Sequence, residues 1–220
     1  MRHSRLFAGL ADAEYRAIIA EIPVETRQLE PGQALIAEGE EVGKIWLITK
    51  GRLAAARKYS DGSLDRVLVF SKRDIIGLDL AYTRTRISPL EIYSLTESCV
   101  SGIAYNFTDD TAIPFGIREH LLKNIAHILA DESIRKQTRL DALYQHSMRA
   151  RINIFLDYKR RKLGGTVFDL KMDREELARH LGVNRSALSK ELSRMQSEGL
   201  IRYQKRHFEI LDEAALRDRQ

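Results

Sequence analysis

The chain has 220 residues, of which 44% are apolar and 30% charged, a composition typical of a globular protein with one or two domains. Its one cysteine, Cys99, excludes an internal disulfide framework, a cysteine-based zinc site and a four-cysteine iron–sulfur cluster. No apolar run approaches the ~18 residues of a membrane span, and residues 1–5 lead into no signal-peptide core. We therefore expect a cytoplasmic protein with no membrane partner.

The net charge of +5 is unevenly distributed along the chain. Residues 1–147 carry 19 basic and 20 acidic side chains, whereas residues 148–220 carry 17 basic and 11 acidic ones. The basic excess therefore belongs to the last third. It indicates either a solvated, unevenly charged surface or a polyanion-binding module joined to a neutral one.

The first half of the chain predicts a short helix followed by an antiparallel β shell. Apolar residues recur at helical spacing in residues 9–21. After them, short apolar runs alternate with turn signals such as Pro31-Gly32 and Ser60-Asp61-Gly62. Many short strands with frequent turns predict a sandwich or barrel of about 100 residues, a shell that often encloses a small-ligand cavity. The expected strands are residues 45–48, 53–56, 67–70, 92–95 and 100–105.

From Thr111 the periodicity becomes helical, and Pro114 is placed to open a helix of about 30 residues. We interpret residues 113–146 as a dimerisation helix whose charged middle faces the partner or a ligand. A connecting helix packed on the β shell is the alternative. Residues separated by alternating steps of three and four form one stripe along this helix, namely Leu122, Ile125, Leu129, Glu132, Lys136, Arg139 and Leu143.

Residues 147–220 predict a helix-turn-helix. A helix begins near Ser147 and ends at Gly164-Gly165, and a short strand follows at residues 168–170. Asp173 and Glu176 resemble the two ends of a capping box at the start of a second helix. The tight turn of residues 182–184 then leads into a third helix, from Arg185 to about Glu198. We expect this third helix to bury Leu188, Leu192 and Met195.

The other face of the third helix has the chemistry of a DNA-reading surface. Arg185 can contact guanine bidentately, Lys190 can donate to guanine or phosphate, and short hydroxyl side chains allow close approach to the bases. Two strands around residues 204–206 predict a basic hairpin, or wing, suited to phosphate contact. The candidate DNA-binding residues are Arg174, Asn184, Arg185, Ser186, Ser189, Lys190, Ser193, Lys205 and Arg206.

Residues 182–192, followed by residues 198–201, resemble the winged helix of the cyclic-AMP receptor/fumarate–nitrate regulator (Crp/Fnr) family. The resemblance extends collinearly over nearly the whole chain, through Phe7–Leu10, Pro31-Gly32, Glu38–Glu40, Ile45–Ile48 and Asp74–Gly77. It implies an α+β fold with a cyclic-nucleotide-binding-type, jelly-roll-like β-roll (1–112), the long dimerisation helix (113–146) and a winged helix-turn-helix (147–220).

The resemblance also implies a function. Members of the family are homodimeric transcription regulators in which an effector in the β-roll re-sets two DNA-binding domains on a two-fold operator, and activators contact RNA polymerase. Arg185 matches the family's first base-contacting arginine. Ser186 stands where many members have glutamate and Lys190 where many have arginine, so the half-site is left open.

The effector pocket departs from the cyclic-AMP pattern. Members that bind cyclic AMP carry Gly-Glu for the ribose and Arg-Ser for the phosphate, whereas here Leu78 follows Gly77 and Ser88-Pro89 aligns with Arg-Ser. Burying a phosphate without a cation is costly, so we predict weak or no cyclic-AMP binding. Arg84 and Arg86 are substitutes only if the loop is shifted.

The charged middle of the long helix has two interpretations. Lys136, Gln137 and Arg139 meet an anionic effector in one of them. In the other they pair with acids of a second subunit, namely Asp131, Glu132 or Asp141. In either interpretation, the small-molecule effector that the resemblance implies is unidentified.

No cofactor is certain. His120 and His127 lie seven residues apart on one helical face, which indicates a surface pair or, alternatively, a haem or metal ligand pair. No other metal site is expected. No Ser/His/Asp order, HExxH, P-loop or paired-carboxylate motif stands out, so we assign no catalytic residue and read Asp79 and Glu91 as surface acids. The competing functions are a ligand-binding regulatory protein that acts through protein contacts and a haem-based gas sensor of the same fold.

Overall fold

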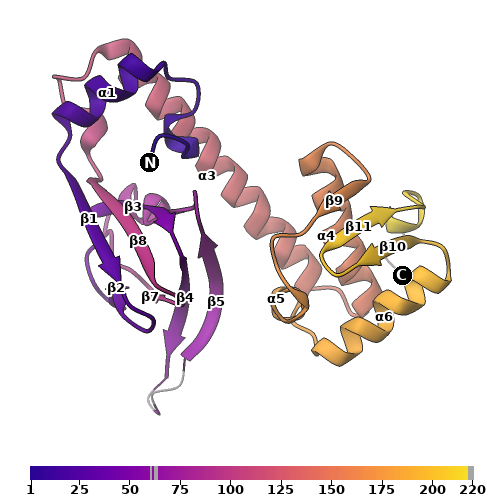
Figure 1. Ribbon diagram of the computed structural model, residues 1–220. Helices are drawn as coiled ribbons and strands as arrows, with labels where there is room; N and C mark the ends of the chain where they lie inside the picture. The colour runs from indigo at the N-terminus through magenta and orange to yellow at the C-terminus, as the bar shows by residue number, and fades with distance from the viewer. Residues whose placement is uncertain (60, 62–63, 218–220) are drawn as a thin grey trace. The chain divides into compact units, whose positions relative to one another are not determined.

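The computed structural model describes residues 1–59, 61 and 64–217. Its internal contacts divide the chain into two compact units, Met1–Ala130 and Asp131–Gln220. The first holds antiparallel sheets and the second a helix-turn-helix, with a long helix that begins in the one and ends in the other (Figure 1). The expected α+β class is confirmed. The turn expected at Ser60-Asp61-Gly62 falls mostly outside the described residues.

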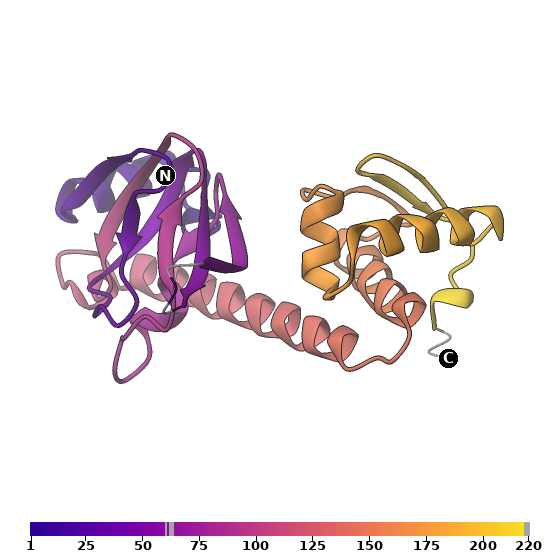
Figure 2. The same ribbon diagram turned by 90° about the horizontal axis from the view of Figure 1, so that it is seen from below.

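In the described part of the first unit, the strands form two four-stranded antiparallel sheets, ordered β1-β8-β3-β6 and β2-β7-β4-β5 (Figure 2). Three of the expected apolar runs lie inside strands, and the other two, residues 92–95 and 100–105, extend one residue past the ends of theirs. The strands are β1 (Val24–Leu29), β2 (Ala34–Ile36), β3 (Lys44–Lys50), β4 (Arg52–Lys58), β5 (Leu64–Ser71), β6 (Ile75–Ile76), β7 (Glu91–Ser94) and β8 (Ser98–Ala104).

Strand β3 is buried on both of its faces, which explains its continuous apolar run. Ile45 and Leu47 pack with the helical layer of the unit, whereas Trp46 and Ile48 pack between the two sheets. The helical layer comprises η1 (Arg5–Phe7), α1 (Asp12–Glu21), α2 (Leu78–Ala81), η2 (Phe107–Asp109) and the first half of α3 (Phe115–Leu143).

The 29 residues of α3 are close to the expected length, and the helix starts directly after Pro114. Its first half belongs to the core of the first unit, because Leu121 and Ile125 are 0% and 4% exposed. Ile125, expected in the dimerisation stripe, therefore faces its own domain. Leu122 and Leu140 are by contrast exposed.

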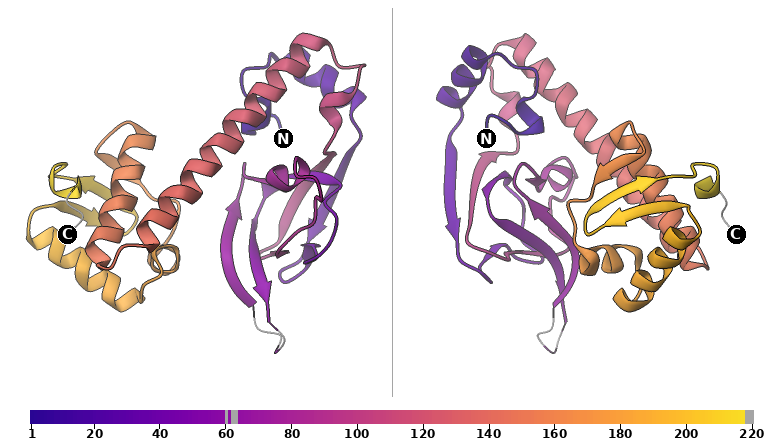
Figure 3. Two further views of the ribbon diagram at one scale, coloured as in Figure 1. Left: turned by 180° about the vertical axis from the view of Figure 1, so that it is seen from behind. Right: turned by 45° about the vertical axis from the view of Figure 1, so that its right-hand side comes forward.

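The second unit combines the end of α3 with three further helices and a small sheet. Its other elements are α4 (Met148–Leu163), β9 (Val167–Asp169), α5 (Arg174–Leu181), α6 (Arg185–Ser197), β10 (Ile201–Gln204), β11 (His207–Ile210) and η3 (Ala215–Arg217). The antiparallel sheet has the order β10-β11-β9, and the β10–β11 hairpin lies next to α6 (Figure 3). One apolar cluster joins α4, α5, α6 and this sheet.

Candidate nucleic-acid interface

The turn between α5 and α6 is fixed by local interactions. The expected capping box is present: the Asp173 carboxylate accepts from the Glu176 N–H at 2.9 Å, and the Glu176 carboxylate accepts from the Asp173 N–H at 2.9 Å. α5 ends at Gly182, whose φ of +63° favours glycine. A Cβ there would lie 2.9 Å from Cδ2 of Leu143. Leu143, expected to face a dimer partner, therefore contacts this turn.

Helix α6 has one buried and one polar face. Leu188, Leu192 and Met195 are fully buried, as expected, so this face packs the helix into the apolar core of the second unit. Arg185 and Lys190 are exposed on the other side. A single helix of this kind fits a major groove about 12 Å wide.

The serines of α6 are less free than expected. Ser186 Oγ donates to Oδ1 of the N-cap Asn184 at 2.6 Å. Ser193 Oγ donates to the Ser189 carbonyl at 3.0 Å and lies 3.1 Å from the Tyr203 hydroxyl. Because the hydroxyl hydrogens of Ser186 and Ser193 are used inside the domain, we regard the exposed Arg185 and Lys190 as the main candidates for contacts from α6.

Arg174 supports the wing. Its guanidinium lies 4.8 Å from the ring centroid of Tyr203 and 5.7 Å from that of Phe208, and burial lowers its pKa. Lys205 forms the hairpin turn with a φ of +54°. Arg174, one of the candidate DNA-binding residues, thus also joins the start of α5 to the two wing strands.

An open recess of about 510 Å³ lies between the start of α5, the start of α6 and the wing. Within the described residues, Nη1 of Arg174 is buried there without a hydrogen-bond partner. The Glu175 carboxylate lies 3.9 Å from Nε of Arg185. Four of the six residues that line the recess are cationic, so the recess suits a phosphate group. Its lining is Asp173, Arg174, Glu175, Arg185, Lys205 and Arg206.

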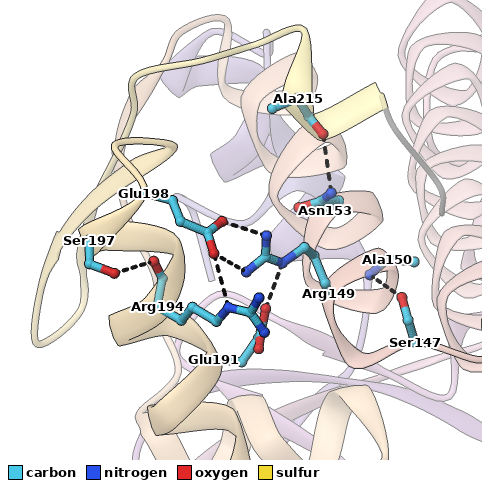
Figure 4. A network of polar contacts seen from close by, with 9 residues as sticks. All are labelled: Ser147, Arg149, Ala150, Asn153, Glu191, Arg194, Ser197, Glu198 and Ala215. Carbon is cyan, nitrogen blue, oxygen red and sulfur yellow. Dashed lines mark hydrogen bonds and ion pairs between the residues drawn. The ribbon is translucent and has the colours of Figure 1, made fainter.

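A charge network that the sequence did not reveal ties α6 to α4 (Figure 4). Arg149 donates from Nε to Glu191 at 2.6 Å and from Nη1 to Glu198 at 2.5 Å. Glu198 also accepts from Nε of Arg194 at 3.0 Å. These contacts raise the pKa of Arg149 and lower that of Glu198, in both cases mainly through their mutual hydrogen bonds. Arg194 is thereby engaged along the helix, and no local sequence pattern marks so distant a pairing.

Three of the residues expected in the effector pocket, Leu78, Ser88 and Arg86, are engaged within the first unit. Leu78 is buried in the core of the first unit, just after Gly77 opens α2 with a φ of +81°. The buried Ser88 donates to the Leu90 carbonyl at 2.7 Å. Arg86 forms an ion pair with Glu41, and its guanidinium lies 4.5 Å from the ring centroid of Tyr105. Arg84 and Pro89 are exposed.

The charged middle of α3 is also partly engaged. Glu132 pairs with Arg135 one turn along the same helix. Nε of Arg139 donates to the His180 carbonyl of α5 at 3.3 Å, and Lys136 is exposed. Glu132 and Arg139 therefore have contacts within their own chain, whichever partner or effector was expected for them.

His120 makes a structural contact within the first unit. Its Nε2 lies 2.7 Å from the Ala8 carbonyl, and its ring lies 2.9 Å from where a Cβ on Gly9 would be. His127 is exposed. Across the described residues, no group of three or more His, Cys, Asp or Glu side chains is arranged to hold a metal ion. Nor does any helix in that part of the chain combine the length and apolar character needed to cross a membrane.

Comparison with known proteins shows which proteins this chain is similar to. Residues 150–219 match the family model of the Crp-like helix-turn-helix domain. The chain is 20% identical over 209 residues to the "Global nitrogen regulator" of Synechococcus elongatus, with 89% of each chain covered. It is 22% identical over 196 residues to the "Transcriptional activator protein FnrA" of Stutzerimonas stutzeri, covering 86% of this chain and 78% of that one.

Solved structures show the same fold. A mutant of CooA from Carboxydothermus hydrogenoformans aligns with a TM-score of 0.65 at 18% identity, covering 90% of this chain and 88% of that one. FixK2 from Bradyrhizobium japonicum aligns with a TM-score of 0.60 at 16% identity, covering 88% and 96%.

A polar-faced helix held in a winged helix-turn-helix, preceded by antiparallel sheets and a long helix, defines a DNA-binding regulator. The resemblance found in the sequence is confirmed: residues 150–219 match a Crp-like helix-turn-helix domain, and the chain is similar over most of its length to transcription regulators of the Crp/Fnr type.

Proposed function

We propose that this protein is an effector-responsive, sequence-specific regulator that binds a two-fold DNA operator as a homodimer. Its parts would be an effector domain (1–112), a dimerisation helix (113–146) and a DNA-binding domain (147–220). The observation that carries the proposal is the amphipathic character of helix α6. Arg185 and Lys190 are exposed on one face, and the apolar residues of the opposite face are fully buried.

On this proposal α6 enters the major groove and Arg185, at its N-terminal end, reads a guanine through O6 and N7. Lys190 donates to a guanine or a phosphate one turn further along. Arg174, Lys205 and Arg206 contact the phosphate backbone from the recess and the wing. The two half-sites of a dimer would lie one helical turn apart, about 34–36 Å.

Dimerisation would use a face of α3 that differs from the one first expected. Leu122 and Leu140 are exposed, and Leu129 is half-buried. Alternating steps of four and three residues connect them in a coiled-coil seam. That seam is Leu122, Ala126, Leu129, Ser133, Lys136 and Leu140. The pattern favours self-association over a solitary connecting helix, and RNA polymerase would be a further partner if the protein activates transcription.

The effector is not expected to be cyclic AMP. Arg86, a possible phosphate ligand, is neutralised by Glu41, and Leu78 occupies core space where the family's cyclic-AMP binders have a ribose ligand. Calorimetric titration of the full chain should therefore show no micromolar binding of cyclic AMP. A micromolar Kd would overturn this part of the proposal.

Selection of bound fragments from random DNA, with and without cell extract, tests the proposed function. We expect enrichment of a two-fold sequence whose half-sites are about one helical turn apart. A dependence on extract would identify the need for a small molecule. If no sequence is enriched under either condition, sequence-specific regulation is the wrong function.

A further inference from the structure

The recess between α5, α6 and the wing has two acidic residues in its otherwise basic lining, Asp173 and Glu175. The Asp173 carboxylate is used by the helix cap, since it accepts from the Glu176 N–H at 2.9 Å. Glu175 has no part in that cap, and its side chain is 57% exposed. A carboxylate at this place repels phosphate. Glu175 is therefore a feature of the recess that phosphate binding does not account for.

Glu175 lies beside the exposed arginine at the start of α6. Its Oε2 is 3.9 Å from Nε of Arg185, and its Oε1 is 3.8 Å from Nη2 of Arg179, one turn further along α5. The capping box fixes the backbone of Glu175 at the second position of α5. Asn184, which accepts from the Ser186 N–H at 2.8 Å, fixes the start of α6. The two side chains thus extend toward each other from backbones that are both held by caps.

The position of the carboxylate affects what Arg185 can bind. A guanidinium presents five N–H donors in a fixed, planar fork. With Glu175 on the Nε side, the two Nη groups remain for O6 and N7 of a guanine. The acceptors of guanine carry no net charge, whereas a phosphate is a full anion that the carboxylate repels. Glu175 therefore favours guanine over phosphate as the partner of Arg185.

We propose that Glu175 is a positioning residue for sequence specificity, which orients Arg185 toward a base edge and opposes its use as a phosphate contact on DNA of any sequence. This inference rests on the proposed function and deepens it, because it assigns the residue by which the recess discriminates operator from random DNA. A repulsive group that penalises the wrong partner is a general source of specificity. The phosphate contacts remain with Arg174, Lys205 and Arg206.

Glu175→Gln tests the inference, because it removes the charge and keeps the shape of the side chain. Without the carboxylate, Arg185 gains a phosphate contact on random DNA. The slope of log affinity against log salt concentration should then steepen by about 0.9 per subunit, or about 1.8 per dimer. On the operator Arg185 already contacts guanine, so the slope there should stay the same. The ratio of operator to random affinity should fall by roughly threefold to tenfold. Fluorescence anisotropy with the full chain, over a range of salt concentrations, measures both quantities.

A double variant separates action through Arg185 from a general effect of charge. In the Arg185→Ala background, Glu175→Gln should leave the slope on random DNA unchanged, because the side chain on which Glu175 acts is absent. Glu213→Gln is the charge-matched control. It removes one acid from the same unit, in a pair with Arg160 outside the recess, and should leave the ratio of operator to random affinity unchanged.

The inference fails if Glu175→Gln leaves the ratio and the random-DNA slope as they are, or if it raises both affinities by the same factor. It also fails if the slope steepens equally in the Arg185→Ala background, since Glu175 would then act on phosphates directly. A parent chain with no operator preference would remove the proposed function and this inference together. A preference that Glu175→Gln does not change would remove this inference alone. Because Asp173 and Glu176 still cap α5, the test does not depend on a variant that misfolds.

Discussion

Two arginines of the same recess have different surroundings. The side chain of Arg185 is 68% exposed at the start of α6, and the Glu175 carboxylate lies 3.9 Å from its Nε. Arg174 is stacked on Tyr203 and Phe208 and is shielded from water, which lowers its pKa. Exposure allows Arg185 to reach a base edge, whereas stacking holds Arg174 in place as part of the wing. The sequence alone placed both in one candidate set, because residue type does not reveal stacking.

Arg185→Ala should therefore weaken operator binding by on the order of 1–3 kcal/mol per half-site and relax the choice of base at one position. The physical reason is the loss of a bidentate contact to guanine. Fluorescence anisotropy with the selected operator, and with each base substitution in its half-site, measures both effects. Arg161→Ala on α4, another exposed arginine, is the control and should change neither. An equal loss on all sequences would show that Arg185 contacts only the backbone.

Arg149→Met should loosen α6 from α4, because it leaves Glu191 and Glu198 facing each other without their shared cation. We expect the free energy of unfolding to fall by roughly 1 kcal/mol, since the network is partly exposed to solvent. Urea denaturation measures the change. Lys123→Met is the control, because the pair that it breaks with Glu119 is a surface one.

The pH dependence of this effect follows from Glu198. The hydrogen bond from Arg149 lowers the pKa of Glu198 in the folded chain below its ordinary value of 4.5. The stabilisation is therefore fully present above that ordinary pKa and is lost as the pH falls through the lower, folded one. The difference between the parent chain and Arg149→Met should shrink under acid; a difference that grows there would contradict the assignment.

At the scale of elements, helix α3 shows where sequence patterns are informative and where they fail. Its length and start were predictable from periodicity and Pro114, but its faces were not. Ile125 and Leu122 both fit a helical apolar stripe, yet Ile125 packs into the first unit and Leu122 does not. Which of two neighbouring stripes packs into the domain core depends on contacts with residues almost 120 positions earlier, such as Leu6 and Phe7.

The strands also differ in how well the sequence pattern predicts them. The apolar run of β3 was readable because both faces are buried, whereas β1 has three consecutive exposed residues and gave no alternating signal. In the second unit, caps and turns act locally, so the capping box at Asp173 and the buried face of α6 were predictable. The Arg149 network and the stacking of Arg174 join distant segments, and local patterns do not encode such pairings.

Leu140→Asp should shift the protein from dimer to monomer, because it places a charge in the proposed apolar seam. Ile134→Asp provides a matched control: Ile134 is at least as exposed on the same helix but points away from that seam. Analytical ultracentrifugation should show a rise in the dimer Kd of at least tenfold for Leu140→Asp and little change for Ile134→Asp. If Ile134→Asp dissociates the dimer and Leu140→Asp does not, the seam lies on another face.

At the scale of the whole molecule, the uneven charge separates two tasks. Residues 1–147 are close to neutral, and the basic excess lies in the part that holds the recess, α6 and the wing. The electrostatic attraction of a polyanion therefore comes from the second unit, and the nearly neutral sheets contribute little to it. The contribution of phosphates to binding can be separated from base reading by its dependence on salt.

If each half of a dimer neutralises about four phosphates, through Arg174, Lys190, Lys205 and Arg206, the logarithm of the operator affinity should fall with the logarithm of salt concentration with a slope near −7. Replacing both Lys205 and Arg206 by glutamine removes about four of those contacts per dimer and should bring the slope to about −3.6. Because phosphates carry no base information, the ratio between operator and random DNA should hardly change. Anisotropy titrations between 50 and 300 mM salt measure both quantities. An unchanged slope in the double variant would place the wing away from the duplex.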